Sequence, residues 1–340
     1  MSTPLLQNIL NQPEALRAVA DYQGSEGYDA LMRAAALLKT KKRILLSGMG
    51  ASLFGCVPLQ YALAELGVPG VAIETAELLY FKPAVLDSDT AVVLVSRSGE
   101  SVEVTKLLPQ LRDCGAAVIG IVNVSESTLA ARADAAIVLG SPSDQLVAIQ
   151  TYTGTVAVLA LLGAALAGDL DAARAELAET AEALQQSIPA SVEGRADWDE
   201  LLDTSAPLYI LGRGSSLGAV AEGVLLMHET AKAPAVGMSV PQFRHGPVEV
   251  TDARFRGVVL ASHRATFELD QALNGDLICM GGKARLLTLR DIPERFVPVA
   301  EVIPLQVAAY RKAELNGVRP GDFRWAPLVT TSETGFGITV

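Results

Sequence analysis

The strongest constraint on the fold is a pattern that occurs twice in the first third of the chain. An apolar run ends in a turn rich in serine and glycine, and a segment compatible with a helix follows. The run Ala91–Val95 ends in the turn Ser96–Ser101, and an earlier copy in Arg43–Gly55 gives Ser52 the same position. Hydroxyls and backbone N–H groups at a helix start can converge on an anion, most naturally a phosphate. The alternative is that both turns only cap helices.

Around these turns, short apolar runs alternate with helical patterns through the first half of the chain. The predicted strands are Ile44–Ser47, Val71–Glu74, Ala91–Val95, Ala117–Val122 and Ala136–Leu139, and the predicted helices are Leu53–Leu66, Ser101–Cys114 and Val147–Leu166. Strands of four to six residues between longer helices are typical of βαβ units around a parallel sheet.

The second half of the chain repeats this pattern after a predicted linker helix at Asp169–Gln186. The segment YILGRGSS in the second half matches ILLSGMGAS in the first. The predicted strands of the second half are Leu208–Leu211, Gly257–Ala261 and Ala284–Leu289, and its predicted helices are Leu217–Ala231 and Leu305–Leu315. We therefore predict an α/β protein with two tandem doubly wound domains, each a parallel sheet flanked by helices. The predicted segments are an N-terminal helical segment (1–29), domain one (30–168), a helical linker (169–199), domain two (200–318) and a tail (319–340). Neither glycine-rich turn is a GxGxxG dinucleotide motif.

Composition limits the partners. Half of the 340 residues are hydrophobic, enough to fill two cores, and the net charge of −11 argues against nucleic acid or an anionic membrane. Three widely spaced cysteines indicate neither a disulfide framework nor a metal site, and we expect no metal or cofactor. The N-terminus lacks the pattern of a signal peptide, so a cytoplasmic protein is expected. The apolar stretch Val156–Ala167 is too short for a membrane span and predicts a buried helix.

The segment Glu222–Val250 holds a second candidate site, because Glu229 and His245 stand sixteen residues apart in it. A carboxylate and an imidazole near a phosphate site can open a sugar ring and carry a proton between adjacent carbons. The alternative is structural: Glu229 pairs with Arg244 or Lys232, and His245 packs in a turn.

For the two remaining histidines, His228 and His263, we predict structural roles.

These residues also carry a resemblance. The whole chain resembles the double sugar-isomerase (SIS) domain family, in particular the isomerase half of glucosamine–fructose-6-phosphate aminotransferase and related deaminases, deglycases and isomerases. The resemblance starts in Leu5–Arg17 and continues through both predicted domains. It implies that a sugar phosphate is bound by the serine of the first turn and by the S-x-S-G-x-[ST] loop. The matching residues are Ser52, Ser96, Arg97, Ser98 and Ser101, with Arg97 standing where the family usually has glutamine.

The resemblance further implies that Glu229 is the catalytic carboxylate and that His245, in the sequence RHGP, opens the ring. Their spacing is that of the family. In that family the histidine reaches the active site of a neighbouring subunit, which implies a homodimer with His245 contributed across the interface.

The chain departs from the family at two lysines. One corresponds to Leu226, and the other, which holds the open sugar as an imine, falls near Pro327 and Leu328 in the tail. Proton transfer by Glu229 and His245 does not need these lysines. We expect the tail to cover the site, with Arg324 as a candidate contact.

The function expected from the sequence is that of a phosphosugar isomerase or amino-sugar-phosphate deaminase. Its expected substrate is a hexose 6-phosphate, such as glucosamine 6-phosphate. A fructosamine-phosphate deglycase and a non-catalytic phosphosugar sensor are the alternatives, and the sequence does not name the sugar.

Overall fold

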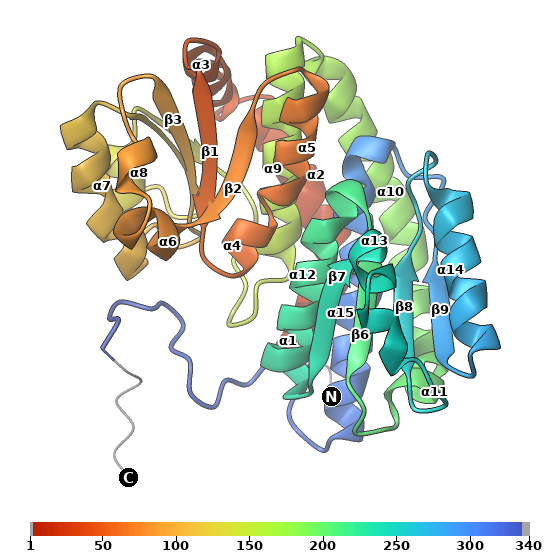
Figure 1. The fold of residues 1–340 in the computed structure, drawn as a ribbon. Helices are drawn as coiled ribbons and strands as arrows, with labels where there is room; N and C mark the ends of the chain where they lie inside the picture. Colours follow the sequence, from red (N-terminus) through yellow and green to blue (C-terminus); the bar gives the residue numbers. More distant parts are fainter. Residues whose placement is uncertain (1–2, 335–340) are drawn as a thin grey trace. The chain divides into compact units, whose positions relative to one another are not determined.

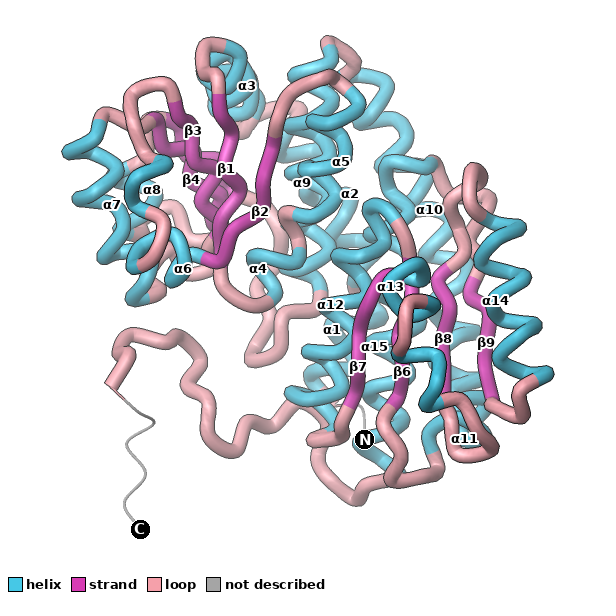
Figure 2. The backbone as a smooth tube through the Cα atoms, viewed as in Figure 1, coloured by secondary structure: helices cyan, strands magenta, loops and turns pink. Residues whose placement is uncertain are grey.

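A computed structural model describes residues 3–334, which divide into two compact units. The first-sheet unit comprises residues 15–177 and the tail from Phe323, and the second-sheet unit comprises residues up to Glu14 together with 178–322. Each unit holds one parallel sheet with helices packed around it, as Figures 1 and 2 show. The predicted α/β class with two parallel sheets is confirmed.

The first sheet has the strand order β2-β1-β3-β4-β5, with every pair parallel. Its strands are β1 (Arg43–Gly48), β2 (Gly70–Glu74), β3 (Thr90–Val95), β4 (Ala117–Val122) and β5 (Ala135–Val138). Every residue of β3 and β4 is buried. Strands that are apolar without alternation belong to a sheet covered on both faces, which is why these runs were recognisable in the sequence.

Eight helices are assigned around this sheet within the described residues. They are α2 (Gln12–Gln23), α3 (Tyr28–Lys39), α4 (Ala51–Phe54), α5 (Val57–Glu65), α6 (Thr75–Tyr80), α7 (Val102–Cys114), α8 (Thr128–Arg132) and α9 (Gln150–Ala167). The single helix predicted for Leu53–Leu66 is wrong, because the chain forms α4 and then α5. Pro58 stands in the first turn of α5, where its missing N–H is tolerated. In the interior of one continuous helix, the same proline would remove a backbone hydrogen bond and interrupt the helix.

Helix α9 is long and apolar enough to cross a membrane, but 89% of this stretch is buried inside the structure. It packs against α3 and α5. The predicted buried helix is therefore confirmed. Its first turn is held by Asp144, whose carboxylate accepts hydrogen bonds from the N–H groups of Ile149, Gln150 and Thr151 at 2.9–3.1 Å.

The second sheet has the order β7-β6-β8-β9, again all parallel. Its strands are β6 (Leu208–Gly212), β7 (Ala235–Ser239), β8 (Arg256–Leu260) and β9 (Lys283–Leu287). The helices in this half of the chain are α1 (Pro4–Leu10), α10 (Leu170–Glu193), α11 (Asp199–Leu202), α12 (Leu217–Leu226), α13 (Val240–Arg244), α14 (Phe267–Cys279) and α15 (Val297–Leu315). The residues of α10 fall partly in each unit, with the division after Leu177.

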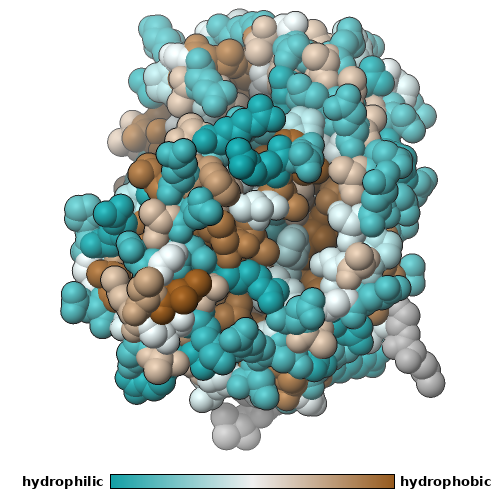
Figure 3. Space-filling model, turned by 90° about the vertical axis from the view of Figure 1, so that its right-hand side faces the viewer, coloured by the Kyte–Doolittle hydropathy of each residue, from teal (hydrophilic) through white to brown (hydrophobic). Residues whose placement is uncertain are grey.

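β7 and α14 are additional to the predicted elements, and α15 begins eight residues before the predicted start at Leu305. β7 is an edge strand whose residues are half-exposed or exposed, so no apolar run marks it. α14 exposes Leu269 and Ile278 and contains an Asn-Gly pair, which blurs its apolar stripe. On the face seen in Figure 3, hydrophobic residues form separate patches among hydrophilic ones.

Candidate functional site

The two serine turns emerge from neighbouring strands of the first sheet. β1 and β3 are adjacent, β2 lies on the outer side of β1, and the remaining strands follow β3. Ser47 near the end of β1 is paired in register with Leu94 near the end of β3, so the two strands end level. In open parallel sheets, ligands bind outside the carboxyl ends of the strands where the strand order reverses. Both predicted turns begin at this position.

The turn after β1 is tight and depends on glycine. Gly50 has φ 51° and ψ −128°, a conformation that side chains with a Cβ rarely adopt. Ser52 follows this turn as the second residue of α4 and is half-buried. Beneath it, the buried hydroxyls of Ser47 and Thr75 lie 3.0 Å apart and join the end of β1 to the start of α6.

The loop after β3 brings two of the predicted serines together. Ser96 is buried, its Oγ accepts a hydrogen bond of 3.1 Å from the N–H of Gly99, and it lies 3.2 Å from the Oγ of Ser101. Ser101 is the N-cap residue of α7. Ser98 is half-buried, and its Oγ accepts from the N–H of Glu100 at 3.2 Å. These hydroxyls therefore line one loop at a helix start.

Arg97 lies in the same loop and is half-buried. Its Nη1 donates a hydrogen bond of 3.1 Å to the carbonyl oxygen of Leu146, in the segment that precedes α9. A guanidinium has five N–H donors in a planar fork, so this contact leaves donors for an anion. The predicted role of Arg97 at a phosphate is compatible with this position.

The tail is attached to the same loop. The N–H of Val102, the first residue of α7, donates a hydrogen bond of 3.0 Å to the carbonyl oxygen of Thr330. Farther along, the Glu333 carboxylate accepts from the hydroxyl of Tyr80 at 2.7 Å and forms an ion pair with Lys106. Tyr80 and Lys106 were not among the predicted site residues, because no local pattern connects them with a tail more than two hundred residues away.

Several tail residues between these attachments and α15 are exposed. Trp325 is 66% exposed and Leu328 53% exposed, and Arg324 is also exposed. Among residues 3–334, the Arg324 side chain makes no hydrogen bond or ion pair, so its predicted contact with substrate stays a prediction. The predicted tail also includes 335–340, which lie outside the described residues.

Glu229 lies in a π-helical turn, Met227–Ala231, that directly continues α12. π-helical turns inside or at the end of α-helices are frequent at functional sites. The turn ends at Lys232, which has φ 54° and whose ammonium donates to the carbonyl oxygens of Glu229 and Asp322. Leu226, at the position of a family lysine, is 1% exposed and belongs to the core.

His245 follows α13 and is exposed. Its imidazole forms no hydrogen bond or ion pair within the described part of the chain. Glu229 precedes β7, and His245 follows it; β7 pairs with β6 along its whole length. A strand of five residues spans about 16 Å. Glu229 therefore lies at the amino ends of the second-sheet strands, and His245 lies at their carboxyl ends. Figure 1 shows α13 beyond one end of β7. Within one chain the structure does not bring these two residues together.

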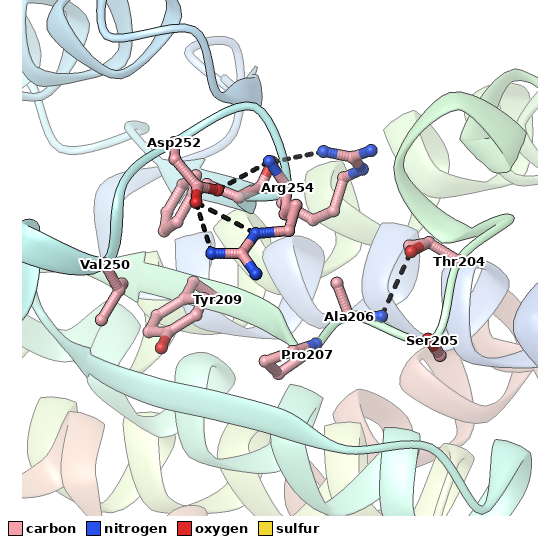
Figure 4. A pocket seen from close by; sticks show the side chains of 10 residues that line it. Thr204, Ser205, Ala206, Pro207, Tyr209, Val250, Asp252 and Arg254 are labelled. Carbon is pink, nitrogen blue, oxygen red and sulfur yellow. Dashed lines mark hydrogen bonds and ion pairs between the residues drawn. The ribbon is translucent and has the colours of Figure 1, made fainter.

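Two hollows open at the amino ends of the second-sheet strands. The one in Figure 4 has a volume of about 410 Å³, has Tyr209 in its wall, and contains the ion pair between Asp252 and Arg254 at 2.6 Å. Hydrogen bonding to Arg254 holds the pKa of Asp252 below its usual value. None of the predicted site residues lines this hollow. The other, of about 400 Å³, is lined by Lys232, next to the π-helical turn.

Comparisons with known proteins show what the chain is similar to. The SIS domain model matches residues 37–167. Over 335 residues the chain is 28% identical to a glutamine–fructose-6-phosphate aminotransferase of Pyrococcus horikoshii, covering 93% of this chain and 55% of that protein. It is 30% identical over 270 residues to the aminotransferase of Aeropyrum pernix, covering 76% of this chain and 43% of that protein. The chain thus spans about half the length of these relatives.

Solved structures share the fold along nearly the whole chain. A glucosamine-6-phosphate deaminase of Thermotoga maritima superposes with a TM-score of 0.80 at 20% identity, covering 96% of this chain and 99% of that one. The C-terminal domain of the Francisella tularensis glucosamine–fructose-6-phosphate aminotransferase gives 0.79 at 22% identity, covering 95% and 99%. Residues 37–167 therefore match the SIS domain, and the chain has the α/β fold of these solved structures. More particularly, it is homologous to the isomerase half of glutamine–fructose-6-phosphate aminotransferases.

Proposed function

We propose that this protein is a cytoplasmic, homodimeric phosphosugar isomerase or deaminase whose substrate is a hexose 6-phosphate, specifically an amino sugar such as glucosamine 6-phosphate. The observation that carries the proposal is the pair of serine turns at the reversal point of the first sheet, in a chain homologous to sugar-phosphate enzymes. The finer choice of sugar rests on the names of the relatives, one of which is a glucosamine-6-phosphate deaminase.

In this proposal the phosphate is held at the start of α7. The hydroxyls of Ser52, Ser96, Ser98 and Ser101 donate to its oxygens, and Arg97 supplies a positive charge. The net charge of the protein is −11, so the anion is attracted by local donors and not by the surface as a whole. A hydrogen bond to a charged group contributes about 1.5–3 kcal/mol, so several such donors suffice for a small phosphorylated ligand.

The chemistry is a proton transfer between adjacent carbons of the opened sugar. The imidazole of His245 moves a hydroxyl proton as the ring opens. The Glu229 carboxylate removes the proton from C2 of the aldose and returns it to C1, which gives a ketose. With an amino group at C2 the same transfer leaves an imine at C2. Water then adds to this carbon and ammonia leaves, so the products are a ketose phosphate and ammonia.

The positions of the two catalytic candidates support a shared site. Within a chain they lie at opposite ends of the second-sheet strands, and the His245 imidazole has no partner among the described residues. A second copy of the chain would bring its His245 to the Glu229 of the first. The missing family lysines, with Leu226 buried in the core, argue against a covalent imine with a lysine and favour catalysis by Glu229 and His245.

The first experiment is a substrate panel followed by phosphorus NMR and ammonia release. It compares glucosamine 6-phosphate, fructose 6-phosphate, an N-acetylated hexosamine 6-phosphate and a fructosamine phosphate. We expect turnover of an amino-sugar phosphate, and loss of about 10²–10⁴-fold in rate for Glu229→Gln. The exposed Glu249→Gln is the matched control and should keep the wild-type rate.

Other results separate the alternatives. Turnover of only the fructosamine phosphate would identify a deglycase. Binding of a sugar phosphate without turnover would identify a sensor, and the buried Leu226 at a lysine position is the observation that keeps this alternative open.

A further inference from the structure

A serine, a histidine and a glutamate form a hydrogen-bonded chain in the second-sheet unit. The Oγ of Ser215 lies 3.1 Å from Nε2 of His263, and Nδ1 of the same imidazole lies 3.2 Å from Oε1 of Glu294. The two ring nitrogens therefore face different partners, and the carboxylate can fix which nitrogen carries the proton. This is the arrangement in which an imidazole removes the proton of a serine hydroxyl and a carboxylate stabilises the resulting imidazolium.

The three residues follow three neighbouring strands of the sheet and lie beyond their carboxyl ends. Ser215 follows β6, His263 follows β8, and Glu294 follows β9, and these strands are neighbours in this order. The strand order reverses between β6 and β8, because β7 lies on the outer side of β6. The serine and the histidine thus lie at the position where open parallel sheets bind ligands. Glu229, by contrast, precedes β7 and lies at the amino ends of the strands.

The turn that carries Ser215 is held rigidly. Gly214 has φ 56°, and a Cβ at this position would lie 3.5 Å from Nε2 of His263, so the backbone passes close to the imidazole. Next to it, Nε of Arg213 donates a hydrogen bond of 2.5 Å to the buried carboxylate of Asp270, which also accepts from Thr266 at 2.9 Å. A nucleophile needs such support, because its distance to the base decides whether the proton can move.

Three carboxyl groups lie around the turn and bear on the choice of substrate. Besides Glu294 and Asp270, the carboxyl group of Glu301 is fully buried on α15, which packs against the turns that hold Ser215 and Glu294. Its oxygens have no hydrogen-bond partner of ordinary geometry among the described residues, although Ser216 and Ser262 lie beside them. The Glu294 carboxylate, 53% exposed, disfavours a phosphate beside Ser215, whereas Asp270 is already paired with Arg213. An uncharged ligand therefore fits this site better than the anion expected at the first sheet.

We propose that Ser215, His263 and Glu294 form a second reactive site, in which Ser215 is a nucleophile toward uncharged carboxylic esters. The Oγ attacks the acyl carbon while Nε2 of His263 takes the hydroxyl proton. The bond from the acyl carbon to the alcohol oxygen breaks, and the alcohol leaves with that proton. Water, deprotonated by the same imidazole, then attacks the acyl carbon of the serine ester. The acid leaves, and the hydroxyl of Ser215 recovers its proton.

The test uses the full chain with two probes, a fluorophosphonate and 4-nitrophenyl acetate. Intact-mass measurement should show one fluorophosphonate adduct per chain, and peptide mapping should place it on Ser215. Ser215→Ala should abolish the adduct, and His263→Ala should slow both labelling and ester hydrolysis by about 10²–10⁴-fold. Glu294→Gln should slow labelling while leaving the unfolding midpoint near that of the wild type, because its side chain is 53% exposed.

The exposed Ser205→Ala is the matched control and should label at the wild-type rate. Turnover of sugar phosphate should be unchanged in Ser215→Ala, so failure of one site is separable from failure of the other. An unlabelled wild type, or equal labelling of wild type and Ser215→Ala, overturns the proposal.

Discussion

The carbonyl oxygen of Thr330 accepts a hydrogen bond of 3.0 Å from the N–H of Val102, at the first residue of α7. A backbone donor at a helix start is a natural ligand for an anion, and here the tail takes it. At Thr330 the tail therefore lies beside the loop that carries the predicted phosphate serines. One turn further along α7, Lys106 holds Glu333. The helix thus contacts the tail at two points.

Weakening the second contact should loosen the tail. Glu333→Gln removes the ion pair with Lys106, and we expect a rise in KM for the sugar phosphate of up to about fivefold, with kcat less affected, because exposed ion pairs contribute little. The pair also raises the pKa of Lys106 and lowers that of Glu333 through the hydrogen bond between them. Steady-state kinetics at low and high salt measure the effect.

The exchange Lys106→Glu with Glu333→Lys is the sharper control. The double variant should recover part of the lost KM, whereas each single charge reversal should be worse than Glu333→Gln. Equal KM values for all of these variants would show that this contact does not position the tail.

Phosphate binding should depend on the loop after β3. Ser98→Ala removes one donor and should weaken sugar-phosphate affinity by roughly tenfold or more, because hydrogen bonds to charged groups contribute about 1.5–3 kcal/mol. Ser96→Ala should cost at least as much, since its buried Oγ also accepts from Gly99 and lies beside Ser101. Calorimetry with glucosamine 6-phosphate measures both. Unchanged affinity in both variants would remove this loop from the site.

Subunit sharing can be tested by mixing inactive variants. Glu229→Gln and His245→Ala should each be inactive alone. After subunit exchange, a mixed dimer contains one site with both wild-type residues, and up to about half of the activity per mixed dimer should return. Exchange is verified by mass-tagged subunits. A lack of recovery after verified exchange would place both residues in one subunit's site, and sedimentation as a monomer at micromolar concentration would exclude sharing.

The two sheets were predictable from sequence because their central strands are buried on both faces and appear as unbroken apolar runs. The edge strand β7 was not, since Gly237 and its neighbours are half-exposed or exposed. This omission hid the main feature of the catalytic candidates, because β7 is what separates Glu229 from His245. His263 was assigned a structural role, since its partners Ser215 and Glu294 come from distant parts of the chain.

The serines at the end of β3 were found from local pattern alone. The tail contacts of Tyr80 and Lys106 depend on side chains that only the folded chain brings together.

The pH dependence of stability should reflect the buried Glu301. Burial raises the pKa of this carboxyl above its ordinary value of 4.5, and the neighbouring hydroxyls of Ser216 and Ser262 only partly oppose this. Below pH 4.5 the group is protonated in both the folded and the unfolded chain. As the pH rises above 4.5, the unfolded chain loses the proton while the folded chain keeps it. The wild type therefore loses stability, by about 1.4 kcal/mol per pH unit, until the folded pKa is reached.

Glu301→Gln carries no such proton, so its unfolding midpoint relative to wild type should rise between pH 4.5 and pH 8. Glu314 provides a control of opposite sign. Burial acts to raise its pKa, but Arg195 and Arg311 lower it overall. Its ion pairs are therefore stabilising above pH 4.5 and are lost in acid, so Glu314→Gln should cost more stability at pH 7 than at pH 4. Thermal unfolding of both variants across this range distinguishes the two signs, and a Glu301→Gln difference that is independent of pH would contradict the assignment.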